Sequence, residues 1–200
     1  MSTCYLSIVI PAYNEEDRLP DTLVKVSAYL SRQSYDWEII VSDDGSEDET
    51  AAVVRNAASH TANLRLLTLP HRGKGSAVKH GMLAAKGQHR FLCDADLSMP
   101  IEFVETLLPP RAPTTDIVIG SREAPGARRI GEPLRRWLMG RLFNAMTQIL
   151  AVPGISDTQC GFKVFNASAA QILFPLQTLD GFAFDAELLF LARRLGLIDW

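Results

Sequence analysis

The sequence contains few cysteines and no excess of positive charge. Its three cysteines, Cys4, Cys93 and Cys160, are odd in number and widely separated, and none belongs to a C-x-x-C pair. This pattern argues against a zinc site or a disulfide framework, and it favours a reduced, cytoplasmic compartment. The formal net charge of -3 is unlike that of a general nucleic-acid-binding protein, which is normally basic, so we expect no nucleic-acid partner.

Long apolar runs are also missing. Ser2 to Tyr5 carry no positive charge, and the apolar run Leu6 to Ile10 is too short for a signal peptide. No segment approaches the roughly 18 uninterrupted apolar residues of a membrane-spanning helix. We expect residues 1–200 to form one domain. The last residues, Leu197 to Trp200, read as the start of a strand, so we expect the domain to be truncated at its C-terminal end.

Strand and helix patterns alternate along the chain. Strands are predicted at Leu6–Ile10, Trp37–Val41, Leu64–Leu69, Arg90–Cys93 and Asp116–Ile119, and helices at Glu15–Leu30, Glu47–Ala58 and Gly75–Lys86. Ser46 and Glu49 have the spacing of a capping box, and Gly87 is expected to end the third helix. Further helices are predicted at Leu134–Val152 and within Gly181–Leu195. The alternation predicts an α/β fold, with a mostly parallel central sheet covered by helices on both faces.

Polar clusters follow three of these strands. They are Pro11 to Glu15, Asp43 to Ser46, and Asp94 to Asp96. Open α/β sheets bind ligands at the carboxyl ends of their strands, so the three clusters should converge at one edge. Asp94 and Asp96 are two residues apart, so in extended backbone both carboxylates point to one side. Mg²⁺ or Mn²⁺ would relieve their repulsion, whereas a turn with two solvated aspartates is the alternative for the motif alone.

The other clusters suggest a nucleotide site. One of Asp43 and Asp44 is expected to accept hydrogen bonds from a base, Tyr13 to stack on that base, and Glu15 to bind base or ribose. The segment from His71 to Ser76 contains glycines and Lys74 ahead of a helix, which suits an anion, although a flexible surface loop explains it about as well. It is not a Walker A motif. None of the four histidines lies in a recognisable motif, and we expect all four to be ordinary surface or loop residues.

Together these residues resemble the family-two inverting glycosyltransferases. The runs Ser7–Glu15, Val41–Ser46 and Asp94–Ser98 look like the opening motif, the second motif and the metal motif of that family. The resemblance implies a single GT-A (Rossmann-like) catalytic domain that covers residues 1–200 and binds a nucleotide-diphosphate sugar. It also implies a divalent metal, Mg²⁺ or Mn²⁺, held by Asp94 and Asp96.

Four further runs narrow the resemblance to enzymes that glycosylate dolichyl or polyprenyl phosphate. They are Gly73–Ala77, Gly120–Arg122, Asp157–Lys163 and Phe182–Glu187. The third run looks closer to dolichyl-phosphate β-glucosyltransferases than to the mannosyl enzymes. The implied reaction transfers a sugar, with glucose favoured, with inversion to a polyprenyl phosphate. UDP-glucose is the favoured donor and GDP-mannose the second. Family members that act on a sugar hydroxyl, and a donor-binding module without transfer activity, remain alternatives.

The resemblance carries over to named positions. The expected catalytic residues are Asp94, Asp96, Arg122, Asp185 and Glu187. The expected substrate-binding residues are Pro11, Tyr13, Asn14, Glu15, Val41, Asp43, Asp44, Lys74, Asp94, Ala95, Asp96, Arg122 and Gln159. A hydroxyl acceptor would need a base, for which Asp157, Asp185 and Glu187 are candidates, whereas a lipid phosphate is already anionic. For Asp185 and Glu187, a structural role with basic residues or at a helix end is equally compatible with the sequence.

A basic segment precedes the predicted helix Leu134–Val152. Its arginines are Arg122, Arg128, Arg129, Arg135, Arg136 and Arg141. Such a segment can dock at the surface of an anionic membrane and present a lipid phosphate. A core helix with a solvated face explains the pattern somewhat better from sequence alone. We therefore expect a cytoplasmic protein, and peripheral contact with the cytoplasmic face of a membrane is a further hypothesis.

Overall fold

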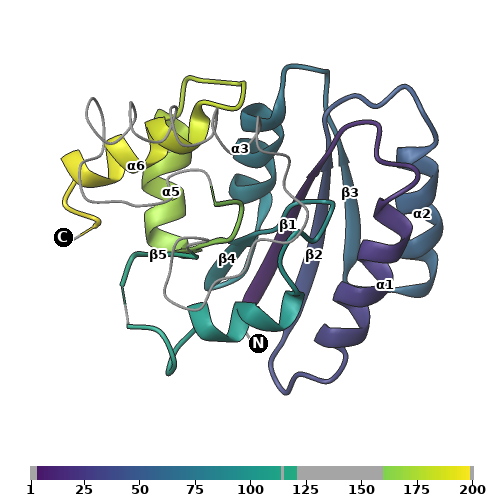
Figure 1. Ribbon diagram of the computed structural model, residues 1–200, viewed down its shortest axis with the longest axis horizontal. Helices are drawn as coiled ribbons and strands as arrows, with labels where there is room; N and C mark the ends of the chain where they lie inside the picture. The colour runs from purple at the N-terminus through teal and green to yellow at the C-terminus, as the bar shows by residue number, and fades with distance from the viewer. Residues whose placement is uncertain (1–3, 114, 121–159, 199–200) are drawn as a thin grey trace, which may run out of the picture.

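The computed structural model describes residues 4–113, 115–120 and 160–198 (Figure 1). These residues form a six-stranded sheet in the order β3-β2-β1-β4-β6-β5. The strands are β1 (Leu6–Ala12), β2 (Trp37–Asp43), β3 (Leu64–Thr68), β4 (His89–Leu92), β5 (Ile117–Ile119) and β6 (Lys163–Asn166). The first four strands pair in parallel, and β6 pairs antiparallel with both β4 and β5. The predicted α/β class with a mostly parallel sheet is confirmed.

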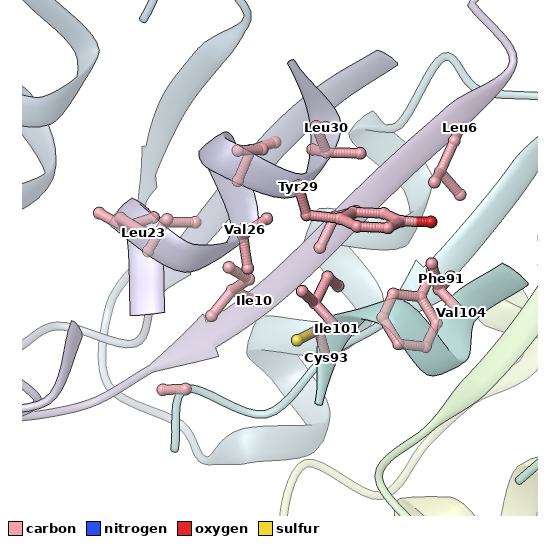
Figure 2. Close-up of a cluster of buried hydrophobic side chains, with 14 of the residues drawn as sticks. Leu6, Ile10, Leu23, Val26, Tyr29, Leu30, Phe91, Cys93, Ile101 and Val104 are labelled. Atoms are coloured by element: carbon pink, nitrogen blue, oxygen red, sulfur yellow. The ribbon is translucent and has the colours of Figure 1, made fainter. Parts of the chain in front are cut away.

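Helices cover both faces of the sheet. Neighbouring side chains of β1 point to opposite sides, so this strand contributes to a core on each face. The helices are α1 (Leu19–Leu30), α2 (Thr50–His60), α3 (Lys74–Ala84), α5 (Ala167–Leu176) and α6 (Phe184–Arg194), with a 3-10 helix η1 (Ile101–Leu107). Ile8 and Ile10 belong to the core with α1 and η1, whereas Val9 belongs to the core with α3, α5 and α6. Figure 2 shows part of the first core, with Val26 of α1 near Ile10 of β1.

Most element boundaries agree with the prediction, but the starts of α1 and α2 do not. Helix α1 begins at Leu19 rather than at Glu15. Helix α2 begins at Thr50 and has no side-chain cap, so the predicted capping box at Ser46 is wrong. The hydroxyl of Ser46 donates to Asp43 Oδ1 at 2.5 Å and accepts from the backbone N–H of Asn14 at 2.9 Å. The serine therefore holds two loops together, and the helix can begin only after them.

Four further elements differ from the expectation, one of them the 3-10 helix η1, which was not predicted. Helix α3 ends at Ala84 rather than at Gly87, and Gly87 approaches Ser7 of β1 closely instead. Strand β6 and helix α5 were not predicted, although Asn166 accepts a hydrogen bond from the N–H of Ala169 and so caps α5. The predicted helix Leu134–Val152 and residues 199 and 200 lie outside the described residues. No helix in the described segments is both long and apolar enough to cross a bilayer.

Candidate active site

The carboxyl ends of β1, β2 and β4 border one cavity of about 590 Å³. This volume lies within the range of small-molecule sites. The cavity is lined by Pro11, Ala12, Tyr13, Glu15, Arg18, Asp44, His71, Gly73, Lys74, Ala77, Asp94, Ala95, Asp96 and Phe182. Residues from all three polar clusters are among them, so the prediction that the clusters converge at one edge of the sheet is confirmed. We call this cavity the strand-end pocket.

The loop after β1 contributes Tyr13 and Glu15 to the pocket. Tyr13 is 41% exposed, so much of its ring is open to a ligand. Glu15 forms an ion pair with Arg18 at 2.7 Å, and its backbone N–H donates to Thr50 Oγ1. Asn14 does not line the pocket. Its side chain instead accepts from the N–H of Glu47 at 2.9 Å, and its positive φ of 53° turns the loop so that this contact forms.

The two aspartates after β2 have different surroundings. Asp43 is buried, and its Oδ1 accepts from the N–H and the hydroxyl of Ser46, so this carboxylate fixes its own loop. Asp44 lines the pocket and accepts from the N–H groups of Arg72 and Gly73 at 3.1 and 2.8 Å. Asp44 is therefore the aspartate at the pocket. The side chain of Val41, another expected substrate contact, is fully buried in the core.

His71 was missed by the sequence interpretation. Its ring stacks on Tyr13 with a centroid separation of 4.1 Å and an interplanar angle of 19°, and it lines the strand-end pocket. The expectation that every histidine is an ordinary surface or loop residue is wrong for His71. It is also wrong for His89, which is half-buried in β4, whereas His80 is an exposed residue of α3 and agrees with the expectation. The position of His71 after a strand and before Gly73 and Lys74 was the available signal.

Asp94 and Asp96 have unequal partners. Asp94 Oδ1 accepts from Lys74 Nζ at 2.7 Å, and the absence of a side chain at Gly161 leaves room for this carboxylate. Burial alone would lower the pKa of Lys74, but Asp94, with smaller contributions from Asp185 and Asp96, raises it above its usual value. Lys74 is therefore cationic at neutral pH. Asp96 is exposed, and in the described chain its Oδ1 accepts from the N–H of Ser98.

The charges of the pocket indicate where a cation fits. In the described part of the chain, Glu15 is balanced by Arg18 and Asp94 by Lys74, and Asp44 is held by backbone N–H groups. Asp96 has no basic partner there. A diphosphate placed beside these acids would be repelled unless a cation lay between them. Mg²⁺ and Mn²⁺ accept one or two carboxylates and complete their shell with water and phosphate oxygens, so this donor set fits such a metal.

No group of three or more His, Cys, Asp or Glu side chains in the described residues has the arrangement of a metal site. Asp94 and Asp96, the two acids after β4, are the side chains of the described chain that fit such a metal, with water and phosphate oxygens as further ligands.

The acids of α6 make structural contacts. Asp185 is buried and accepts from Lys163 Nζ at 2.7 Å, and neither residue lines the strand-end pocket. Glu187 accepts from the N–H and the hydroxyl of Thr178 and from the N–H of Leu179. These contacts favour the structural alternative for both acids. Arg122, Asp157, Gln159 and the basic segment from Arg122 to Arg141 lie outside the described residues.

The loop between α5 and α6 covers the start of α3. Asp180 O accepts from the N–H of Ser76 at 3.2 Å, and the backbone of residues 179–181 lies so close that Gly73 and Gly75 leave no space for a side chain. The same loop places Phe182, 74% exposed, at the pocket, with Lys74 Nζ 5.9 Å from its ring centroid. Part of the predicted anion site at this helix end is thus already occupied by the protein, and Gly73 and Lys74 remain at the pocket.

Comparison with known proteins identifies the family. The family model "Glycosyl transferase family 2" matches residues 7–174. A dolichyl-phosphate beta-glucosyltransferase of Trichomonas vaginalis is 42% identical over 96% of this chain and 60% of its own length. The human dolichyl-phosphate beta-glucosyltransferase is 35% identical over 96% of this chain and 64% of its own length. The chain thus spans about three fifths of the curated relatives that it matches.

Solved structures share the fold. Glucosyl-3-phosphoglycerate synthase of Mycobacterium tuberculosis, crystallised with UDP, superposes with a TM-score of 0.69 at 23% identity and covers 97% of this chain and 67% of that one. A complex of the same synthase with Mn²⁺, UDP-glucose and phosphoglyceric acid gives a TM-score of 0.70 at 22% identity, with the same coverage of 97% and 67%. At this identity the likeness shows the GT-A-like fold and no more. With the family model matching most of its length, this chain belongs to glycosyltransferase family 2.

Proposed function

We propose that this chain is the donor-binding and catalytic part of an enzyme that transfers glucose from UDP-glucose, with inversion, to a dolichyl or polyprenyl phosphate. Relatives that match nearly the whole of this chain bear the name dolichyl-phosphate beta-glucosyltransferase, which supports glucose as the sugar and dolichyl phosphate as the acceptor. The observation that carries the proposal is the pair of acids after β4, in which Lys74 neutralises Asp94 while Asp96 is exposed and has no basic partner in the described chain.

On the donor side, we expect the base and the diphosphate to occupy different parts of the strand-end pocket. Tyr13 and Asp44 offer an exposed ring face and a carboxylate for the base, and Glu15 also lines the pocket. Asp96, assisted by Asp94, would hold Mn²⁺ or Mg²⁺ at the other side. When bound, that metal supplies positive charge to the departing nucleoside diphosphate.

Lys74 adds a fixed positive charge at the same place. Its raised pKa keeps the ammonium protonated at neutral pH, and from the first residue of α3, beside Asp94, it would stabilise the charge that develops on the leaving group. The proposal predicts that Lys74 contributes to transfer even if it is not a metal ligand.

On the acceptor side, the contacts of Asp185 and Glu187 favour a phosphate over a hydroxyl. A hydroxyl nucleophile has to lose a proton to a base. A phosphate monoester is already largely dianionic at neutral pH, since its second pKa is about 6, so it needs orientation rather than a base. Both acids of α6 are engaged by Lys163, Thr178 and Leu179. Docking of the basic segment from Arg122 to Arg141 on an anionic membrane would bring the lipid to the site, and liposome co-sedimentation with neutral and anionic vesicles tests this part.

Calorimetry tests the donor side. UDP-glucose should bind with Mn²⁺ present and lose most of its affinity without it, and GDP-mannose should bind more weakly. Asp96→Ala should abolish the metal dependence and leave the fold intact. Asp36→Ala, an exposed aspartate just before β2 at the opposite end of that strand, should behave like the wild type. Unchanged metal-dependent affinity in Asp96→Ala would contradict the metal assignment.

A transfer assay with labelled UDP-glucose and a short polyprenyl phosphate tests the acceptor side. We expect an acid-labile glycosyl phosphate lipid as the product. Donor binding without transfer would favour a binding module, and transfer to a sugar hydroxyl in preference to the phosphate would favour the other branch of the family.

A further inference from the structure

The stacked pair of Tyr13 and His71 has an asymmetric environment. Tyr13 follows β1 and His71 follows β3, so the two rings come from segments far apart in the sequence. Their centroids are 4.1 Å apart, and their planes are close to parallel at 19°. One face of Tyr13 is therefore covered, yet the residue remains 41% exposed and lines the strand-end pocket. The uncovered part of the ring is available for a flat ligand.

His71 is held in place by contacts that do not involve Tyr13. Its Nδ1 lies 2.8 Å from Asp44 Oδ2 and 3.0 Å from Asp44 O, and both are acceptors, so Nδ1 donates. Asp44 is in turn buried and fixed by the N–H groups of Arg72 and Gly73. The ring of His71 is thus anchored to β2 through a buried carboxylate.

The backbone is also shaped to admit His71. Gly45 has a φ of +73°, and a Cβ at this position would lie 2.7 Å from the backbone N of His71. A residue with a side chain would be strained there and would push the segment after β3 away from Asp44. The approach of His71 to Asp44 and Tyr13 is therefore built into the loops after β2 and β3.

From this arrangement we infer that His71 is a positioning residue for the nucleobase of the donor. His71, anchored by Asp44, supports one face of Tyr13 and thereby fixes the ring so that its other face stacks on the base. This inference rests on the proposed function, because it needs the base to lie at Tyr13. Ordering an aromatic side chain before binding removes an entropic cost from the binding step. An aromatic pair of this kind accounts for roughly a three- to tenfold difference in affinity.

Three substitutions at His71 separate its two contacts. His71→Ala removes both the stack and the bond to Asp44. His71→Phe keeps an aromatic ring against Tyr13, and His71→Asn keeps a donor for Asp44 without a ring. His60→Ala, at an exposed position in the last turn of α2, is the matched control. Urea titration establishes that each variant is folded before binding is measured.

The probes are UDP and inorganic pyrophosphate, each with Mn²⁺, measured by calorimetry. We expect His71→Ala to weaken UDP binding roughly three- to tenfold and to leave pyrophosphate binding unchanged, because only UDP carries a base. In the transfer assay KM for the donor should rise with little change in kcat. His71→Phe should recover most of the UDP affinity and His71→Asn should not. In a Tyr13→Ala background, His71→Ala should cost nothing further.

Several results would overturn the inference. One is unchanged UDP affinity in His71→Ala while the wild type binds UDP, which leaves the proposed function standing. Another is an equal loss of UDP and pyrophosphate affinity, which would mean that the substitution disturbs the diphosphate side. A third is a full additional cost in the Tyr13→Ala background. A wild-type protein that binds no UDP at all would instead overturn the proposed function, and this inference with it.

Discussion

The buried ion pair between strand β6 and helix α6 offers the sharpest test of what an acid near the site does. Lys163 is 1% exposed, and its Nζ donates to Asp185 Oδ1 at 2.7 Å and to Cys160 O at 2.6 Å. Asp185 is 6% exposed and lies in the first turn of α6. Among the described residues, Asp185→Ala would leave the buried ammonium of Lys163 with the carbonyl of Cys160 as its hydrogen-bond partner. Breaking such a pair from one side costs about 3–5 kcal/mol.

The expected loss is large for a chain of this length. At roughly 2–4 °C per kcal/mol, the melting temperature should fall by about 6–20 °C. Total stabilities of domains are about 5–15 kcal/mol, so this loss is a large fraction of the total, and urea titration at low temperature is the appropriate measurement. Asp180→Ala, an exposed aspartate in the loop before α6, should change the free energy of unfolding by no more than about 0.5 kcal/mol.

A double variant separates a structural role of Asp185 from a catalytic one. Replacing both charges, in Lys163→Met with Asp185→Leu, removes the uncompensated ion, and such replacements are often neutral or stabilising. We expect this variant to recover the stability that Asp185→Ala loses and to retain glucose transfer. Wild-type stability in Asp185→Ala would refute the packing argument. A stable double variant without transfer activity would show that Asp185 acts on the acceptor, as a base would.

Two further predictions concern packing and pH. Gly75→Ala should destabilise the protein by about 1–3 kcal/mol, because the added Cβ would lie 2.5 Å from Leu179 O. Gly181→Ala should not destabilise it, because no atom lies within 4 Å of the Cβ that would be added there. Equal urea midpoints for the two variants would contradict the close approach at Gly75. Burial lowers the pKa of His89 below its usual value. The imidazole of His89 therefore becomes protonated at a higher pH in the unfolded chain than in the folded protein. The free energy of unfolding should fall as pH drops below about 6.5. Urea midpoints between pH 7 and 5 should fall less steeply in His89→Phe and as steeply as the wild type in His60→Gln, and an unchanged slope in His89→Phe would refute this assignment.

The part of the fold that follows from local sequence was predictable. Strands β1 and β2 are β-branched and apolar runs. The alternation of strands and helices predicted the α/β class, the helices on both faces of the sheet, and the sheet edge at which the polar clusters converge. Strand β6 was not predicted, because it has only four residues and begins with Lys163, a residue type that argues against burial. Asp185, the ion-pair partner of Lys163, lies in α6. No local sequence pattern predicts an ion pair between residues so far apart in the chain.

Within the site, the sequence predicted where the polar clusters lie but not which partners their individual residues contact. Asp43 and Asp44 are adjacent and chemically identical. Only the conformation of the folded loops determines that Asp43 accepts from Ser46 and that Asp44 accepts from His71. The capping box was the natural interpretation of Ser46, since the competing partner, Asn14, comes from another loop. Tertiary hydrogen bonds replaced a local one in this case.

The structure likewise distinguishes the two acids of the proposed metal motif, Asp94 and Asp96, better than their spacing does. Spacing alone treats Asp94 and Asp96 as equivalent, yet in the described chain Lys74, at the start of α3, forms its ion pair with Asp94. A cation placed symmetrically between the acids would compete with the Lys74 ammonium, whereas one held mainly by Asp96 would leave the ion pair intact. Two positive charges would then flank the donor diphosphate, one bound with the nucleotide and one belonging to the protein. Lys74→Met should therefore weaken donor binding without removing its metal dependence, whereas Asp96→Ala should remove the dependence itself.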